Sequence, residues 1–200
     1  MENITFDLLN MHQHGAAFYD YLRMRKRVFV DELGWEIPHN DFVEMDQYDN
    51  PMTHYSLVVR DGRVIGGARA LSTVAEWNGA GCMLNDVLEG KLPTIPKSVI
   101  DGPIRTPLVW ECSRLVMAED IGAAEERAEC LSLIVDGLAD MARSQGASEL
   151  ISLTRLPLLR ALRQLGWACD RIGQPYTQDG RSYAVLSMPA DKLRPAIAAE

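Results

Sequence analysis

Short apolar runs and the turns between them divide the first half of the chain. Such runs predict three strands, over residues 3–9, 54–60 and 63–71. The second and third strands meet at Asp61-Gly62, a dipeptide typical of a tight hairpin turn. Gly66-Gly67 within the third strand indicates a bulge or a close approach of another backbone. Helices are expected over residues 16–30, with one basic face, and over residues 83–88.

The second half of the chain alternates strands with helices. Residues 120–145 have the clearest helical spacing, with Asp120 expected to cap the first turn and Gly146 to end the helix. A shorter helix is predicted over residues 156–165. Strands are predicted over residues 107–117, 149–154, 167–172 and 182–188. This order predicts an α/β fold in which a mixed central sheet is flanked by helices, within one domain spanning residues 1–200.

The predicted strand at residues 107–117 is unusual because charged residues interrupt it. A strand in the middle of a sheet is normally a continuous apolar run, yet this one carries Glu111, Ser113 and Arg114. A buried charge is unfavourable unless it is paired. Glu111 and Arg114 therefore either pair with each other or with a neighbouring helix, or they line a cleft. Strand alternation places Cys112 on the opposite face, so we do not expect it to act as a nucleophile.

An acidic, irregular segment follows the basic helix. Its carboxylates are Asp31, Glu32, Glu36, Asp41, Glu44, Asp46 and Asp49. About twenty residues without regular structure are more than a compact domain usually contains, unless they form a lid or a binding loop. The acidic segment and the basic helix can therefore pair with each other. Trp35 in this segment is either a core residue or a platform for a flat or cationic ligand.

Composition limits the classes of function. The chain has 200 residues with 47% hydrophobic content, and its net charge of −8 argues against broad binding to nucleic acid or anionic membranes. Residues 141–200 nevertheless hold 8 Lys/Arg against 5 Asp/Glu, a net charge of +3. This excess either marks a surface for an acidic or phosphorylated partner, or it is an uneven surface without a partner.

Cysteine spacing and the amino terminus predict a cytoplasmic location. The four cysteines are far apart and form no Cys-x-x-Cys motif, which is typical of a reduced chain without a metal site. The amino terminus lacks a basic region, and no apolar stretch reaches the roughly 18 residues that a membrane span needs. We therefore expect neither secretion nor membrane insertion.

Five short motifs follow one another between about residues 20 and 117. They are Arg25-Lys26-x-x-Phe29, Leu33-Gly34-Trp35, Met45-Asp46-x-Tyr48-Asp49, Arg69-x-Leu71 and Trp110-Glu111-x-Ser113-Arg114. In this order they resemble the signatures of the acyl-homoserine-lactone synthases, the quorum-sensing autoinducer synthases of the N-acetyltransferase-like superfamily. Each motif alone has low specificity, whereas five in order are specific. Leu88 and Leu115 depart from many relatives, which carry Phe there, so the resemblance does not fix the shape of the acyl pocket, although it does imply the reaction.

The resemblance implies a GNAT-like three-layer αβα sandwich and a defined reaction. S-adenosylmethionine is the amine donor, and an acylated acyl carrier protein, sometimes an acyl-CoA, is the acyl donor. Both are substrates, so no cofactor is expected. The products are an N-acyl-L-homoserine lactone, methylthioadenosine and the free thiol. By position, the resemblance assigns eight residues to the active site, namely Arg25, Phe29, Trp35, Asp46, Asp49, Arg69, Glu111 and Arg114.

These residue types suit S-adenosylmethionine, which carries a sulfonium, an ammonium, a carboxylate and an adenine. We expect carboxylates to hold the cationic end, a guanidinium to hold the carboxylate, and aromatic rings to hold the adenine or sulfonium. The candidate carboxylates are Asp46 and Asp49. The candidate guanidinium belongs to Arg25, Arg69 or Arg114, and the candidate rings are Phe29 and Trp35. Glu111 is the candidate general base for the attacking amine. The Ser113 hydroxyl or the backbone beside it is the candidate donor to the oxyanion.

The acyl donor is expected to be carried by a protein. The turn at residues 118–123 has two acids and one glycine where coenzyme A enzymes cradle phosphates. An acidic carrier is expected to dock on four basic residues, Arg143, Arg155, Arg160 and Arg163. The acyl chain is expected between the strands at 108–117 and 149–154, near Met83, Ser152, Leu153 and Thr154. Ser152 and Thr154 either select the oxidation state of the acyl chain or only hydrogen-bond to backbone.

Two other functions remain possible from the sequence. A generic acyl-CoA-dependent N-acyltransferase would need a glycine-rich phosphate turn and would not need the charges between residues 25 and 49. A protein that binds S-adenosylmethionine or the acyl carrier without catalysis would keep the same motifs. Acyl lactone formation separates the three possibilities.

Overall fold

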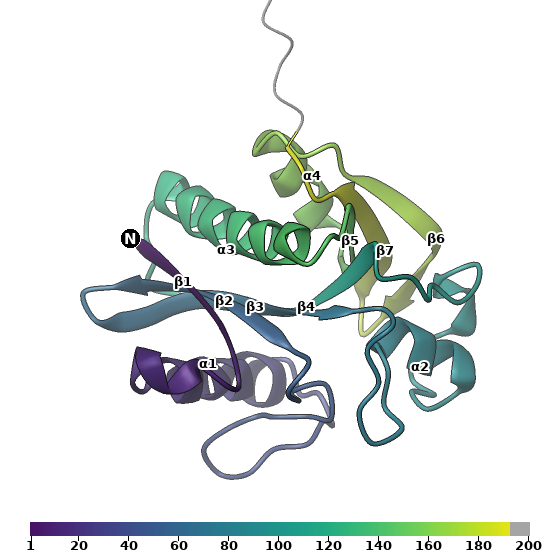
Figure 1. The fold of residues 1–200 in the computed structure, drawn as a ribbon, viewed down its shortest axis with the longest axis horizontal. Coiled ribbons are helices and arrows are strands. Elements are labelled where there is room, and N and C mark those ends of the chain that lie inside the picture. Colours follow the sequence, from purple (N-terminus) through teal and green to yellow (C-terminus); the bar gives the residue numbers. More distant parts are fainter. Residues whose placement is uncertain (193–200) are drawn as a thin grey trace, which may run out of the picture.

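A seven-stranded mixed sheet forms the centre of the computed structural model, which describes residues 1–192 (Figure 1). The strand order is β1-β2-β3-β4-β5-β7-β6, and each neighbouring pair is antiparallel except β4 and β5. The strands span Glu2–Asp7 (β1), His54–Arg60 (β2), Arg63–Ser72 (β3), Val109–Met117 (β4), Glu149–Arg155 (β5), Asp170–Gln178 (β6) and Arg181–Pro189 (β7).

Helices cover both faces of this sheet, which confirms the predicted three-layer αβα fold (Figure 1). The α-helices span Ala17–Arg25 (α1), Met83–Glu89 (α2), Ala124–Ser144 (α3) and Pro157–Gln164 (α4). Short 3-10 helices span Met11–His14 and Lys97–Val99. In Figure 1, α3 lies above the sheet and α1 below it. Alternate residues of β4 pack on opposite faces of the sheet: Trp110 lies in the core under α3, and Val109 lies in the core beside α2.

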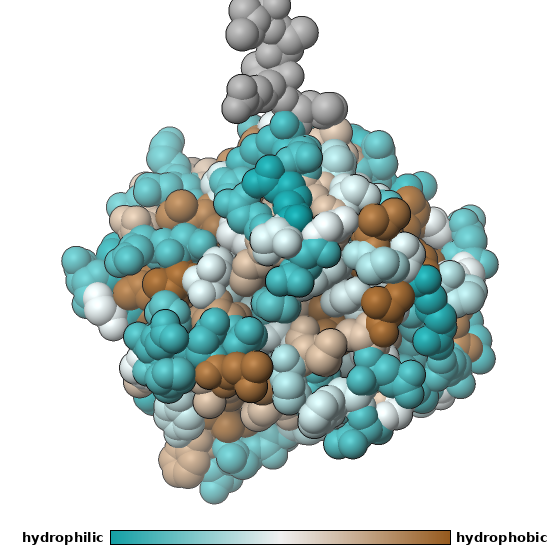
Figure 2. Space-filling model, viewed as in Figure 1, coloured by the Kyte–Doolittle hydropathy of each residue, from teal (hydrophilic) through white to brown (hydrophobic). Residues whose placement is uncertain are grey.

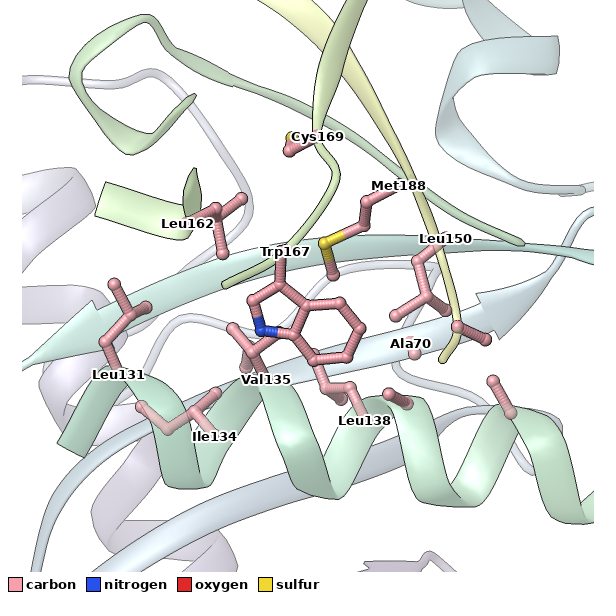
Figure 3. Close-up of a cluster of buried hydrophobic side chains, with 14 of the residues drawn as sticks. Ala70, Leu131, Ile134, Val135, Leu138, Leu150, Leu162, Trp167, Cys169 and Met188 are labelled. Carbon is pink, nitrogen blue, oxygen red and sulfur yellow. The ribbon is translucent and has the colours of Figure 1, made fainter. Parts of the chain in front are cut away.

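The core between α3 and the sheet is built around Trp167 (Figure 3). Figure 3 shows its indole ring between the α3 side chains Val135 and Leu138 and the β7 side chain Met188. The helical spacing of apolar residues predicted this buried face of α3. At Gly137 the helix approaches the sheet so closely that an added Cβ atom would lie 2.4 Å from Ser56 Oγ.

The start of α3 differs from the prediction. The helix begins at Ala124, after Ala123, and no side chain caps its first turn. Asp120 lies outside the helix and instead forms a bidentate ion pair with Arg63, at 2.7 and 2.8 Å. The carboxylate that was predicted to cap α3 is therefore bound by Arg63, a residue far away in sequence. The end of the helix is as predicted, with Gly146 at φ 85°.

The helix predicted over residues 16–30 changes its geometry partway. Regular α-helix ends at Arg25, and the next seven residues, Lys26–Glu32, form a π-helix. π-Helical turns often occur at functional sites because they shift side chains relative to a regular helix. Phe29 lies on this π-helix and is buried in the core between α1 and the sheet. The following residues, 33–53, contain no helix or strand, as the sequence indicated.

The strand predicted over residues 167–172 begins and ends later, as β6, Asp170–Gln178. Its pairing with β7 shifts register between Ile172 and Tyr176, so the strand continues past the predicted end through residues 173–175. Gly173 has φ 65°, and a Cβ atom there would lie 2.1 Å from the Val99 carbonyl oxygen. This bulge therefore lets the connector after α2 pack directly on β6.

The outer surface mixes polar and apolar residues. Figure 2 shows hydrophilic side chains over most of the face seen in Figure 1, with hydrophobic ones in small separate groups. Within residues 1–192, none of the helices has both the length and the apolar character needed to cross a bilayer.

Candidate active site

The central sheet opens at Glu111. Strands β4 and β5 pair over only three residues, Val109–Glu111 with Glu149–Ile151. Beyond this point β4 continues to Met117 beside β3 alone, and β5 continues beside β7 alone. Within the described residues, the second half of β4 therefore has no strand paired to it on the side of β5.

A bulge follows directly in β4. Ser113 pairs with Arg69 and Val116 pairs with Gly67, so two residues, Arg114 and Leu115, oppose the single residue between them on β3. Arg114 takes the left-handed conformation, with φ 58°, which is rare for a residue with a side chain. As a result, Ser113 and Arg114 both point to the α1 face instead of alternating, while Leu115 packs with the α3 core.

Three guanidinium groups and three carboxylates meet on the α1 face. Arg25 donates to Glu44 at 2.6 Å and to both oxygens of Asp49 at 2.8 Å. Arg69 donates to both oxygens of Asp46 at 2.6 and 2.9 Å, and it lies 2.8 Å from Asp49. The predicted pairing of the basic helix with the acidic segment is therefore confirmed for Arg25, and Arg69 of the sheet joins the same network. The formal charges of the six groups cancel, which makes their burial tolerable.

Arg114 completes the network and connects it to two aromatic rings. Its guanidinium lies 2.7 Å from Asp46 and 3.3 Å from Glu44. Its central carbon lies 5.3 Å from the ring centre of Phe29 and 5.9 Å from that of Trp35. The two rings are stacked, 4.9 Å apart. Trp35 is therefore neither a plain core residue nor a free platform, because it stacks on Phe29 beside the charge network.

Electrostatics distinguishes Arg114 from the other two arginines. Burial would raise the pKa values of Asp46 and Asp49, but Arg69 and its neighbours outweigh burial and hold both below the usual range. For Arg25 and Arg69 the carboxylates prevail over burial, and their pKa values are raised. The pKa of Arg114 is instead lowered, by burial and by the repulsion of Arg69. Arg114 is thus the guanidinium that another anion would stabilise most.

Glu111 is separate from this network and faces α2. It is 3% exposed, and its Oε2 accepts a hydrogen bond from the backbone N–H of Leu84 at 3.1 Å. Its Oε1 is buried without a partner among the described residues. Burial raises the pKa of Glu111 to about 7, although the Leu84 N–H, the Cys82 thiol and Arg69 lower it. The simple pairing of Glu111 with Arg114 is not observed, and the group has the pKa of a base that works near neutral pH.

Several residues of this region were not identified from the sequence. Glu44 is fully buried and bridges Arg25 and Arg114, yet in the sequence it was one acid among seven. Tyr48 donates to Asp86 of α2 at 3.0 Å and thereby fastens the acidic segment to α2. Tyr48 belongs to a motif quoted above, whereas Asp86 carries no local signal because its partner is 38 residues away.

The predicted acyl-pocket residues do not all share one environment. Leu153 packs in a hydrophobic cluster that includes Leu84 of α2 and Ile151. Strand alternation places Ser152 and Thr154 on the opposite face, with Leu150 of the α3 core. Met83 is the first residue of α2 and is partly buried. Only Leu153 among the four therefore lies in the cluster between α2 and β5.

The arginines proposed for carrier docking are also divided. Arg160 and Arg163 of α4 line an open groove of about 580 Å³, with Leu156, Leu159, Gln164 and Arg171. Arg171 of β6 was not predicted, because the sequence does not place β6 beside α4. Arg143 pairs with Asp140 and Asp191 and does not line this groove. Arg155 is exposed at the end of β5.

Comparison with known proteins gives a consistent result. The family model described as autoinducer synthase matches residues 9–196. The acyl-homoserine-lactone synthase of Acinetobacter nosocomialis is 33% identical over 90% of this chain and 95% of that protein. That of Aeromonas hydrophila is 29% identical over 86% and 78%. The structure of TofI, in a ternary complex with an inhibitor and MTA, has a TM-score of 0.73 at 28% identity, over 96% of this chain and 92% of that chain.

Proposed function

The chain belongs to the autoinducer synthase family, so it is an enzyme that makes an acyl-homoserine lactone, and we propose roles for its site residues. The reaction joins the amine of S-adenosylmethionine to the acyl group of a thioester and then closes the lactone ring. In the proposal, Glu111 is the base, Arg114 holds the substrate carboxylate, and Ser113 assists the oxyanion.

The observation that carries the base role is the unpartnered, buried Oε1 of Glu111. A buried carboxylate oxygen without a donor is unfavourable, and a substrate ammonium would satisfy it. An α-ammonium in water has a pKa of roughly 8, and it must lose a proton before it can attack. Glu111, with a pKa of about 7, can take that proton directly or through a water molecule at neutral pH.

The proposed position of the substrate carboxylate follows from how the three arginines are paired with the carboxylates of the protein. Arg25 and Arg69 already hold carboxylates in bidentate geometry. Arg114 is the arginine whose charge is least stabilised by its neighbours, so a substrate carboxylate would be bound most favourably there. Asp49 receives hydrogen bonds from Arg25, Tyr55 and the backbone of Asp46. We therefore assign Asp49 to holding the arginines in place, and Asp46 to the side nearer the substrate.

Acyl transfer needs no covalent enzyme intermediate. The amine nitrogen attacks the thioester carbon, the C–S bond breaks, and the thiolate takes up a proton. Ser113 accepts a hydrogen bond from Arg69 Nε at 3.0 Å, so its own O–H remains available to the oxyanion. Burial raises the pKa of the Cys112 thiol to about 12, which makes it a poor nucleophile.

Lactone formation follows on the same substrate. The carboxylate oxygen attacks its own Cγ atom, the C–S⁺ bond breaks, and methylthioadenosine leaves. The TofI complex with MTA supports this product. The carboxylate must leave Arg114 before it attacks, and folding the substrate chain back on itself brings the oxygen close to Cγ.

We infer that the acyl donor is an acylated carrier protein. Glu125 and Glu126 occupy the first turn of α3, where coenzyme A phosphates would meet like charge. The groove beside α4 offers Arg160, Arg163 and Arg171 around Leu156 and Leu159. A cationic rim around an apolar floor fits an acidic carrier that buries an apolar residue.

The reaction is tested with purified protein, S-adenosylmethionine and either an acylated carrier or an acyl-CoA, followed by mass spectrometry. We expect an acyl lactone and methylthioadenosine, formed faster with the carrier. An acylated amine without methylthioadenosine would indicate a generic N-acyltransferase. Absence of product with both donors would indicate a binding protein. Faster reaction with acyl-CoA would contradict the inferred donor alone.

A further inference from the structure

Tyr21 lies outside the motifs that resemble the family, yet it contacts the central strand at its most strained residue. Its side chain is fully buried on α1. Its hydroxyl donates to the backbone carbonyl of Arg114 at 2.8 Å, across 93 residues of sequence. Arg114 is the bulge residue with φ 58°. Arg114 has no pairing partner on β3, and Tyr21 supplies a donor to its partly buried carbonyl.

The surroundings hold the Tyr21 ring in place. The Arg25 guanidinium lies over the ring at 5.3 Å, and Tyr55 meets it edge to face at 6.2 Å. On β3, a Cβ atom at Gly67 would lie 3.1 Å from the Tyr21 ring and 2.3 Å from Leu57. The Tyr21 ring therefore fits here because residue 67 has no side chain. The same glycine pairs with Val116, at the far side of the bulge.

The bulge decides which way the Arg114 side chain points. In a regular strand, a residue next to Ser113 would face the apolar cluster under α3, which includes Trp110 and Leu131. The left-handed conformation turns Arg114 to the α1 face, where Glu44 and Asp46 receive it. That conformation is unfavourable for arginine and persists only if its surroundings hold it.

We propose that Tyr21 is a positioning residue for Arg114: its hydroxyl holds the bulge of β4 and so directs the guanidinium into the substrate site. This inference rests on the proposed role of Arg114 in binding the carboxylate of S-adenosylmethionine. Tyr21 does not touch the substrate. It acts through the backbone of the residue that does.

The test is Tyr21→Phe, which keeps the ring and removes only the hydroxyl. We expect KM for S-adenosylmethionine to rise about tenfold, while KM for the acyl thioester changes less than twofold. Tyr19→Phe, on the exposed side of the same helix, is the matched control and leaves both unchanged. A merely structural role would lower the melting temperature of Tyr21→Phe and leave both KM values of the folded enzyme unchanged, which would overturn the proposal.

Two further measurements separate this proposal from the proposed function. In an Arg114→Lys background, Tyr21→Phe should change KM for S-adenosylmethionine less than twofold, whereas an undiminished tenfold effect would show that Tyr21 does not act through Arg114. A crystal structure of Tyr21→Phe should show residue 114 with a changed φ and its side chain away from Asp46. An unchanged bulge would overturn the proposal even if the enzyme made no lactone.

Discussion

The backbone N–H of Leu84 donates to Glu111 Oε2 at 3.1 Å, so the second residue of α2 fixes the orientation of a carboxyl group on β4. Within residues 1–192, Oε1 is the oxygen of this carboxyl group that has no hydrogen-bond partner. The Leu84 contact also connects Glu111 to the hydrophobic cluster that contains Leu84 and Leu153. The proposed base and the expected acyl environment thus both contact the same short helix.

Replacing Glu111 by Gln should lower kcat by about 10²- to 10⁴-fold, the range for loss of a general base. The amide keeps the size of the side chain and accepts the Leu84 N–H bond, so the affinity for S-adenosylmethionine should change little. Steady-state kinetics and calorimetric binding measure the two effects separately. Near-normal turnover would remove Glu111 from the base role.

The pH profile of kcat/KM should report the same group. Because only the ionised carboxylate accepts the proton, and its pKa is about 7, kcat/KM should fall tenfold per pH unit below about pH 7. Above that pH the contribution of Glu111 should level off. A profile whose acidic limb breaks near pH 4.5, the ordinary value for glutamate, would contradict the buried environment of Glu111.

Stability should depend on pH in the opposite sense. The pKa of Glu111 is 4.5 in the unfolded chain and about 7 in the fold, so the folded protein binds the proton more tightly. The contribution of this group to the free energy of unfolding is therefore complete below pH 4.5 and is lost as pH rises through 7, by about 3 kcal/mol. Urea unfolding should find Glu111→Gln more stable than the parent at pH 8, and the difference should shrink towards pH 5.

Asp49→Asn should destabilise the fold strongly. It removes one carboxylate from a buried network and leaves Arg25 and Arg69 with too little negative charge. Breaking a buried ion pair in this way costs about 3–5 kcal/mol. Asp31→Asn, which breaks an exposed pair with Lys26, is the matched control and should cost about 0–1 kcal/mol. Equal urea midpoints for the two variants would contradict the assigned role of Asp49.

Gly137→Ala should reverse the usual effect of this substitution in a helix. Alanine normally stabilises a helix relative to glycine by about 1 kcal/mol. Here the new methyl group would lie 2.4 Å from Ser56 Oγ and 2.5 Å from Asn3 Oδ1, so overpacking should destabilise the protein by about 1–3 kcal/mol. Ser56→Ala in the same chain should recover part of the loss. A stabilised Gly137→Ala protein would show that α3 does not pack this closely on the sheet.

Charge reversal of Arg160 and Arg163 should weaken use of an acylated carrier. Both residues line the groove beside α4, so replacing them by Glu should raise KM for the carrier at least tenfold and leave KM for S-adenosylmethionine unchanged. Arg23→Glu, an exposed site on α1, makes the same kind of charge change elsewhere and should have no such effect. An unchanged KM for the carrier would exclude this groove as the docking site.

Much of the layout could be predicted because short-range patterns govern it. The hairpin across Asp61-Gly62 and the buried face of α3 depend on residues close together in sequence. Predictions failed where a distant partner decided the outcome. Asp120 binds Arg63 across 57 residues instead of capping α3. Likewise, the bulge of β6 at Gly173 lies directly against the Val99 carbonyl, a contact between segments far apart in sequence.

The sequence by itself determined most of the elements and most of the charged residues of the network, though not Glu44, because periodicity and motif order are properties of neighbouring residues. Only the tertiary structure decided which arginine pairs with which carboxylate. Arg25 and Arg69 are held by carboxylates from the acidic segment, Arg114 is left least supported, and Glu111 keeps one oxygen free. Those differences arise from burial and from distances of a few ångströms between segments far apart in sequence, which local patterns do not specify.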